Sequence, residues 1–444
     1  MYQGGMISMK KIEYKPMLIS IILVLLIYYF YTPALNIHAI EFWIFLIVSL
    51  CIYGAASSYS SLIEKEINPK KLGYLGTVVA VIVVGILVTD LFTSKIFHAS
   101  RYASRIEVEN VKFNNKTLHE VDFSKTPIID RKSTVKLGDK VMGEIPEYVS
   151  QFEVSDDYTQ ISYKNSVYRV TPLEYASLFK YLTNSKNGIP AYITVNSTNG
   201  KAEIVKLKDL GLDGMKYVPS AILNHNLNRK LQLSYPTSIF GSPSFEVDEK
   251  GHPWYVCTTY TYFGVGNKKK VTGAVLFDPI TGKSKKYDKD KVPKWVDRVY
   301  PEELIMTEID ENGSLQDGFF NSVLGQKNVT VTSEGYNYLE KDGDIWIYSG
   351  ITSANKDSSN LGFVLSNLRT HKTLRFSCSG ANEKAAMKSA EGEVKNYGYD
   401  ATFPLLVNVG GHPVYLISLK DSGGLIKQYA MVDAKDYQKV SVYS

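Results

Sequence analysis

The chain has 444 residues, 44% hydrophobic and 21% charged, so it is too long for one ordinary domain and its charge is too low for a disordered polymer. Fifty Lys and Arg against 45 Asp and Glu leave a net charge of +5, spread over the whole length. This diffuse charge gives no concentrated basic field, and nucleic acid is therefore not expected as a partner. The strongly apolar runs lie almost entirely in the first 94 residues, which sets an apolar N-terminal part apart from a polar remainder.

Residues 1–94 are predicted to form a membrane anchor. Three long uncharged stretches predict three transmembrane helices, because about 20 apolar residues cross a bilayer and hydrocarbon does not tolerate unpaired backbone. The chain is therefore expected to be an integral, multi-pass protein of the cell membrane. No ionisable residue lies centrally in a stretch, so the anchor is interpreted as a tether and not as an ion pathway. The predicted helices cover about residues 17–35, 42–63 and 72–92.

The orientation of the anchor follows from its lysines. Three precede the first apolar stretch and three lie between the second and third, whereas residues 32–39 contain neither Lys nor Arg. By the positive-inside rule the N-terminus is predicted to be cytoplasmic, and residues from about 95 onward extracytoplasmic. The lysines are Lys10, Lys11 and Lys15 before the first stretch, and Lys65, Lys70 and Lys71 before the third.

The exported part is predicted to consist of a connector at 95–132 and two α+β regions at 133–290 and 291–444. Its most informative feature is the phrase Gly-x-Pro-x-Tyr, which occurs at residues 188–192, 251–255 and 411–415. Gly and Pro together favour a turn, and the Tyr opens a run typical of a strand. Each phrase therefore predicts a turn that leads into a strand.

Helical patterns accompany these turns and suggest a repeat. The pattern at 382–397 has Asn382 as its N-cap and apolar residues spaced for one inner face. The expected fold is thus three N-terminal transmembrane helices followed by an α+β region of repeated helix-plus-antiparallel-hairpin modules. The other helical patterns lie at 134–149, 173–182 and 220–232.

A helix followed by a hairpin, with Gly-x-Pro-x-Tyr before the first strand and Asp-x-x-Thr-Gly-Lys after the second, resembles PepSY-type domains. The likeness is best at Gly251–Lys283 and Gly411–Lys439. Over about residues 95–444, phrases such as Trp-Val-Asp-Arg-Val-Tyr-Pro at 295–301 are similar to an uncharacterised family of membrane-anchored proteins from Gram-positive bacteria. The resemblance implies an extracytoplasmic domain, and PepSY-type domains are associated with peptidase inhibition or chaperoning and with cell-surface binding.

Two groups of residues are candidates for a binding surface. His252 and His412 occupy equivalent positions in two phrases and are either a paired metal or acid-base site or simply turn residues. The loop Gly264–Lys270 carries three adjacent lysines and is either an exposed hairpin tip or a contact for an anionic polymer or the outer membrane surface. The candidate surface comprises His252, Tyr255, Lys268, Lys269, Lys270, His412 and Tyr415.

The strands that begin at Tyr192, Tyr255 and Tyr415 are expected to offer edges to which an extended peptide could be added as a further strand. No catalytic residue, cofactor or metal is predicted. Cys257 and Cys378 lack metal-ligand spacing and form either a disulfide or two free thiols. Acidic clusters at 302–303, 308–311 and 342–344 are either solvated loops or the paired carboxylates of a glycosidase.

The leading hypothesis is a membrane-anchored extracytoplasmic protein of the cell envelope that binds, scaffolds or inhibits other molecules and is not an enzyme. Its expected partners are the membrane and envelope proteins or peptides. One alternative is an envelope hydrolase that acts on cell-wall polymer. The other is a sensor or accessory subunit of a membrane complex.

Overall fold

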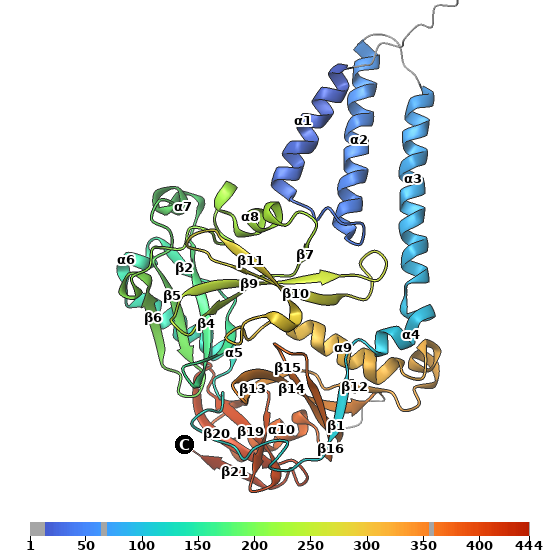
Figure 1. The fold of residues 1–444 in the computed structure, drawn as a ribbon. Coiled ribbons are helices and arrows are strands. Elements are labelled where there is room, and N and C mark those ends of the chain that lie inside the picture. Colours follow the sequence, from blue (N-terminus) through green and yellow to red (C-terminus); the bar gives the residue numbers. More distant parts are fainter. Residues whose placement is uncertain (1–13, 64–68, 355–358, 444) are drawn as a thin grey trace, which may run out of the picture. The chain divides into compact units, whose positions relative to one another are not determined.

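A computed structural model describes residues 14–63, 69–354 and 359–443 (Figure 1). The chain divides into two compact units. The helical unit comprises Met1–Thr93 and two later segments, Gln232–Ile239 and Tyr262–Lys268. The sheet unit comprises the rest, which is Ser94–Leu231, Phe240–Thr261 and Lys269–Ser444.

The helical unit contains α1 (Tyr14–Tyr31), α2 (Ile40–Ile63) and α3 (Pro69–Phe92). Two of these helices are long and apolar enough to cross a membrane, namely α2 over Ile40–Tyr59 and α3 over Leu72–Phe92. Both stretches are almost entirely unburied within the protein, as expected for surfaces that face lipid.

The prediction of three transmembrane helices is wrong in its first member. The described apolar part of α1, Met17–Tyr31, is shorter than the two candidate spans. The helix ends at Tyr31 because Thr32 adopts a left-handed φ of 43° and is followed by Pro33, which disfavours helical backbone before it. The predicted span at 17–35 therefore loses its last turn. Lys10, Lys11 and Lys65 of the orientation argument lie outside the described residues.

The described strands of the sheet unit form four sheets. The first contains β2 (Phe152–Val154), β3 (Thr159–Tyr163), β4 (Ser166–Tyr175), β5 (Ala191–Asn196) and β6 (Ala202–Lys206). The second contains β7 (Ile239–Phe240), β8 (Ser244–Val247), β9 (Pro253–Thr261), β10 (Lys270–Phe277) and β11 (Ser284–Asp288). The third contains β1 (Val108–Val111), β12 (Thr330–Thr332), β13 (Asn337–Lys341), β14 (Asp344–Ser353), β15 (Ser359–Asn367) and β16 (Thr373–Ala381). The fourth contains β17 (Asp400–Ala401), β18 (Leu405–Val409), β19 (His412–Lys420), β20 (Ile426–Asp433) and β21 (Val440–Tyr443).

All four sheets share one connectivity. In each set of five consecutive strands, the first and second both pair with the third, the third pairs with the fourth, and the fourth with the fifth. The third sheet adds β1, which pairs with β16 in parallel. Because two short strands share one edge of a long strand, the sheets are curled and not flat (Figure 1). The predicted helix-plus-hairpin module is therefore wrong, since the repeating element is a five-stranded sheet.

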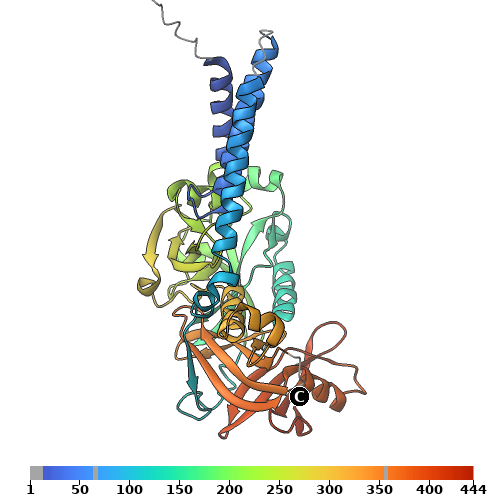
Figure 2. The same cartoon turned by 90° about the vertical axis from the view of Figure 1, so that its right-hand side faces the viewer.

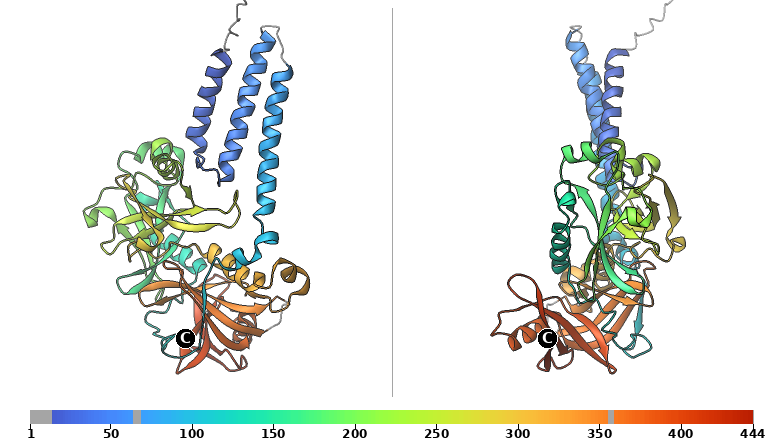
Figure 3. Two further views of the ribbon diagram at one scale, coloured as in Figure 1. Left: turned by 45° about the vertical axis from the view of Figure 1, so that its right-hand side comes forward. Right: turned by 90° about the vertical axis from the view of Figure 1, so that its left-hand side faces the viewer.

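Helices connect and cover these sheets. Helix α5 packs on β5 and β6 (Figure 3), and α10 packs on β19, β20 and β21 (Figure 2). The predicted cap of α10 is confirmed, because the Asn382 side chain accepts a hydrogen bond of 2.9 Å from the Ala385 N–H. The α-helices that follow α3 are α4 (Lys95–Ala103), α5 (Arg131–Gly143), α6 (Pro146–Val149), α7 (Leu178–Asn184), α8 (Leu227–Ser234), α9 (Glu302–Leu315) and α10 (Glu383–Glu393).

Candidate functional site

The tyrosines of the repeated phrase are core residues. Tyr192, Tyr255 and Tyr415 are only 1%, 2% and 3% exposed. The Tyr192 hydroxyl donates to the Gly251 carbonyl oxygen at 2.9 Å, and the Tyr415 hydroxyl donates to that of Ala381 at 2.8 Å. Tyr255 and Tyr415 therefore offer no side-chain surface to a partner.

The strands that carry these tyrosines are not free edges, so the expected strand addition at them is wrong. Strand β5 is paired on both sides, by β4 and β6, and β9 lies between β10 and the pair β7 and β8. Strand β19 is likewise paired on both sides, by β20 and by β17 and β18. The phrase opens an interior strand of each sheet because its apolar run belongs to the core.

The basic loop is not an exposed hairpin tip. Within the helical unit, the His38 Nδ1 lies 2.8 Å from the Gly264 carbonyl oxygen, and the Gly266 N–H donates to the His38 carbonyl at 3.1 Å. The Asn267 amide donates to the backbone oxygen of Asp90 at 3.0 Å. The glycines allow this close approach, since a Cβ on Gly264 would meet the Thr93 hydroxyl at 2.3 Å. The loop thus joins the end of α3 and the segment before α2.

The three lysines of this loop differ in exposure. Lys270 is exposed, whereas Lys268 and Lys269 are half-buried. The Lys269 ammonium lies 4.0 Å from the centre of the Tyr260 ring, a cation–π distance. The loop therefore presents less free positive charge than its sequence suggests.

The two histidines of the repeated phrase belong to different sheets. His252 is half-buried, 3.4 Å from an Asp278 carboxylate oxygen and next to the Trp254 ring. His412 is exposed at the start of β19. In the part of the chain that the structure describes, no group of three His, Cys, Asp or Glu residues could hold a metal ion, and all three cysteines are free thiols.

The acidic clusters at 302–303 and 308–311 form helix α9, where the structure replaces the expected solvated loop with buried ion pairs. The buried Glu308 and Glu311 lie 3.2 and 2.6 Å from the Arg105 guanidinium, and His371 reaches Glu308 at 2.7 Å. The His371 ring also stacks on Tyr300 with 4.3 Å between centroids. These carboxylates are neutralised by fixed partners and act in structure.

A second carboxylate pair consists of Glu246 and Asp297, which are 0% and 1% exposed. Glu246 accepts backbone hydrogen bonds of 2.8 and 3.1 Å from Asp297 and Arg298, and Asp297 accepts one of 2.7 Å from Ser162. Burial raises the pKa of Glu246 to about 7 and that of Asp297 well above its usual value. Through Ser162 of β3 and Glu246 of β8, these hydrogen bonds link the first sheet to the second.

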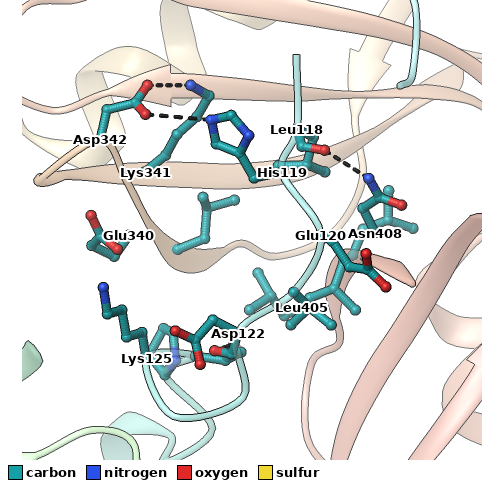
Figure 4. A pocket seen from close by; sticks show the side chains of 16 residues that line it. Leu118, His119, Glu120, Asp122, Lys125, Glu340, Lys341, Asp342, Leu405 and Asn408 are labelled. Atoms are coloured by element: carbon teal, nitrogen blue, oxygen red, sulfur yellow. Dashed lines mark hydrogen bonds and ion pairs between the residues drawn. The ribbon is translucent and has the colours of Figure 1, made fainter. Parts of the chain in front are cut away.

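One cavity of about 210 Å³ lies between residues 118–127, β13 and β18 (Figure 4). Asp342 is the carboxylate of this lining that has ion-pair partners within it. His119 lies 3.7 Å from the Asp342 carboxylate, Lys341 pairs with the same group, and the Asn408 amide donates to the Leu118 carbonyl at 2.7 Å. This hollow is smaller than ordinary ligand sites of about 300–1,000 Å³, and it contains no buried charge that lacks a partner.

A larger cavity, of about 400 Å³, forms where the first, third and fourth sheets meet the N-terminus of α5. We refer to it as the Arg169 cavity. Its volume lies within the range of ordinary ligand sites. The lining residues are Asp130, Arg131, Lys132, Tyr158, Gln160, Arg169, Tyr336, Asn337, Tyr338, Ala401, Thr402, Phe403 and Lys420.

Arg169 is 5% exposed and forms no ion pair with any described carboxylate. Its Nε donates to the Gln160 side-chain oxygen at 2.9 Å, and its Nη1 donates to the Ile129 carbonyl at 3.0 Å and the Thr134 hydroxyl at 3.1 Å. The third nitrogen, Nη2, has no hydrogen-bond partner among the described residues. Burial lowers the pKa of Arg169, because a poorly solvated environment disfavours the charged guanidinium.

The nearby acid, Asp130, is already engaged. It caps α5, where it accepts a hydrogen bond from the Ser133 N–H. It also accepts a hydrogen bond of 2.8 Å from the Lys420 ammonium. Burial alone would raise the pKa of Asp130, but the bonds from Lys420 and Ser133 outweigh it and hold the pKa below its usual value. The cavity therefore contains one committed carboxylate against the cations Arg131, Lys132, Arg169 and Lys420.

Sequence reasoning missed this cavity because its residues are spread from position 130 to 420. One signal was available. Arg169 stands inside the apolar run of β4, where a charged residue is rarely buried without a partner.

No family model matches the sequence, and no curated protein matches it, so the resemblance to PepSY-type domains stays a prediction. Among solved structures, the chain is similar to the crystal structure of an ACO/RPE65 chimera, with 9% identity and a TM-score of 0.15. The match covers 66% of this chain and 48% of that one, so the chain spans about half the length of the structure it matches. A likeness this weak carries no functional argument.

Proposed function

We propose that the chain is a membrane-attached, non-catalytic binding protein of the cell envelope, and that its sheet unit takes up a ligand in the Arg169 cavity. The observation that carries this proposal is a buried cation without an anionic partner beside a cavity of about 400 Å³. Folding does not favour such a charge on its own account, because an unpaired buried charge is costly. A site that is completed by a ligand explains its retention.

Membrane attachment is supported by the two candidate spans, α2 and α3. Lys65, Lys70 and Lys71 lie between these spans and favour a cytoplasmic turn. With that turn inside, the sheet unit that follows α3 is extracytoplasmic. The predicted cytoplasmic N-terminus depends on the path of the chain before α2 and stays a prediction.

Labelling with a membrane-impermeant thiol reagent tests the orientation. A Lys286→Cys variant places an exposed thiol on the outer strand β11. With Cys51, Cys257 and Cys378 changed to Ser, it should label in intact cells to the same extent as after lysis. Labelling only after lysis would contradict the extracytoplasmic placement.

Native mass spectrometry of the full chain, released from lipid nanodiscs after incubation with a small-molecule fraction of the cell envelope, tests the binding function. The matched variant is Ala401→Phe, which puts a large side chain in the cavity lining and keeps Arg169 itself. We expect a non-covalent adduct on the unmodified chain and none on Ala401→Phe. An adduct of equal abundance on both, or its conversion to a product, would contradict a non-catalytic site in this cavity.

A further inference from the structure

We propose that the Arg169 cavity recognises an oxyanion, a phosphate or carboxylate group, on a ligand whose planar or apolar portion lies against the cavity's aromatic wall. This inference deepens the proposed function and rests on it. It assigns the anion-binding role to the sheet unit and not to the lysine-rich loop 264–270.

The charge of Arg169 sets the sign of the ligand. A guanidinium keeps its proton at all ordinary pH values, so the cation must be neutralised by a partner and cannot titrate away. Its Nε and Nη1 are bound to neutral oxygens of Gln160, Ile129 and Thr134, and its guanidinium lies 5.9 Å from the centre of the Tyr338 ring, so none of these contacts supplies a full negative charge. Nη2 remains to bind one oxygen of an incoming anion, and a guanidinium suits planar carboxylate and tetrahedral phosphate alike.

A second group supports the same ligand chemistry. Gln160 lies directly across the β3–β4 pair from Arg169 and is 4% exposed. Its side-chain oxygen is used by Arg169, but its Nε2 is buried without a hydrogen-bond partner. Because Nε2 is a donor, the missing partner is an acceptor, as an oxyanion oxygen would be.

The surroundings add positive charge, of which Arg131 is itself 3.7 Å from the exposed Asp157 carboxylate. Arg131 and Lys132 occupy the first turn of α5, whose N-terminus lies at the cavity. Lys420 is already paired with Asp130, so that pair is close to neutral. The anion therefore meets Arg169 as the deepest cation and Lys132 as a cation nearer the surface.

The aromatic wall defines the other part of the ligand. Tyr336 and Tyr338 pack edge to face at 5.7 Å, and Phe403 lies on the same cavity. The Tyr338 hydroxyl is committed to Glu302 at 3.0 Å and its ring lies 5.9 Å from the Arg169 guanidinium, so the wall and the cation adjoin each other. Faces of this kind bind planar rings and the apolar faces of sugars.

Isothermal titration of the full chain in detergent, at fixed ionic strength, tests the inference with phenyl phosphate as the probe. Inorganic phosphate supplies the anion without the ring, benzoate supplies a carboxylate with a ring, and phenol supplies a ring without the charge. We expect phenyl phosphate to bind at least tenfold more tightly than phenol, with benzoate and inorganic phosphate between them.

Two variants probe the arginine itself. Arg169→Met removes the cation. Gln160→Glu keeps Arg169 and places a carboxylate beside its Nε, so a protein side chain neutralises the cation. Both should weaken phenyl phosphate at least tenfold, and Gln160→Glu does so without deleting the arginine's hydrogen bonds. Lys270→Met, in the lysine-rich loop, is the control and should bind as the unmodified chain does.

Phenyl phosphate that binds equally to Gln160→Glu and the unmodified chain, or more weakly than phenol, overturns the anion assignment. So does a loss confined to Lys270→Met. Failure of the inference is distinguishable from failure of the proposed function, because an adduct that Ala401→Phe abolishes and Gln160→Glu retains leaves the cavity a binding site for a neutral ligand.

Discussion

Two buried arginines of the sheet unit have opposite surroundings. Arg105, between α4 and α9, has a side chain only 5% exposed and lies 3.2 and 2.6 Å from the carboxylates of Glu308 and Glu311. Arg169, at the cavity, is equally buried and forms no ion pair with any described carboxylate. The first arginine is paired with two carboxylates, whereas the second contacts only neutral oxygens and the Tyr338 ring. Burial of a charged group therefore does not by itself point to a site, and the proposed function depends on burial without a counter-charge beside a cavity.

The largest expected effect concerns Arg105, the arginine that has ion-pair partners. Arg105→Met leaves Glu308 and Glu311 without the cation that neutralises them, although Lys95 and His371 still reach one each. Removing one partner from a buried ion cluster typically lowers the free energy of unfolding by about 3–5 kcal/mol. Denaturant unfolding followed by tryptophan fluorescence measures the loss. The control is Lys372→Met, an exposed lysine 3.9 Å from Glu109, whose loss should stay below about 1 kcal/mol. Equal losses for the two variants would break the comparison.

A pH titration extends the comparison to the Glu246–Asp297 pair, two buried carboxyl groups whose pKa values are raised by burial. Burial raises the pKa of Glu246 from an ordinary 4.5 to about 7, so between these pH values the folded chain binds more protons than the unfolded chain. The contribution of Glu246 to the free energy of unfolding is therefore fully present below about pH 4.5 and is lost as the pH rises through about 7. Asp297→Asn should flatten this slope in unfolding experiments at a series of pH values. If Asp297→Asn leaves the dependence of the free energy of unfolding on pH unchanged, that dependence comes from other groups.

Two tyrosines of the repeated phrase show the same contrast between a partnered and an unpartnered buried group, here with uncharged hydroxyls. The Tyr415 hydroxyl donates to Ala381 and accepts from the Asn360 amide at 3.2 Å, whereas the Tyr255 hydroxyl is buried without a partner. Tyr415→Phe should lower the free energy of unfolding by about 1–2 kcal/mol, since it leaves the Ala381 carbonyl unpaired. Tyr255→Phe should leave stability unchanged or slightly higher. Thermal unfolding compares the two, and a larger loss for Tyr255→Phe would reverse the assignment.

The smallest expected change in stability comes from neutralising Arg169 internally. Gln160→Glu should raise the free energy of unfolding by about 1 kcal/mol, because the new carboxylate replaces a neutral acceptor on a buried cation. Gln160→Met is the matched control, and it should lower stability by removing that acceptor. A loss for Gln160→Glu comparable to that for Gln160→Met would show that the unmodified chain already neutralises Arg169.

The sequence predicted local features well and their assembly poorly. The Asn382 cap of α10 depends on residues three apart, and the structure confirms it. The two longer apolar stretches likewise became candidate spans, α2 and α3. The repeated Gly-x-Pro-x-Tyr phrase did mark strand starts, but it could not show that each strand is interior. That property depends on pairing partners from elsewhere in the chain, such as β17 and β18 on β19.

The candidate site was hidden for the same reason. Its cation comes from β4, its wall from β13, and its committed ion pair from Asp130 and Lys420, which are far apart in the sequence. The predicted lysine-rich loop drew attention because its charges are adjacent in sequence. In the structure that loop is bound to helix ends within the helical unit, and two of its lysines are half-buried. Adjacent lysines in the sequence therefore did not indicate the candidate site, whereas a single arginine in an apolar strand did.

The most direct test of the central claim is the free energy of unfolding of the full chain as a function of inorganic phosphate concentration, at constant pH and ionic strength. A ligand that binds only the folded state raises this quantity by RT ln(1 + [L]/Kd). We predict a saturable rise for the unmodified chain and no rise for Gln160→Glu. No rise in the unmodified chain, or the same rise in both, would contradict the claim that Arg169 is held for an external anion.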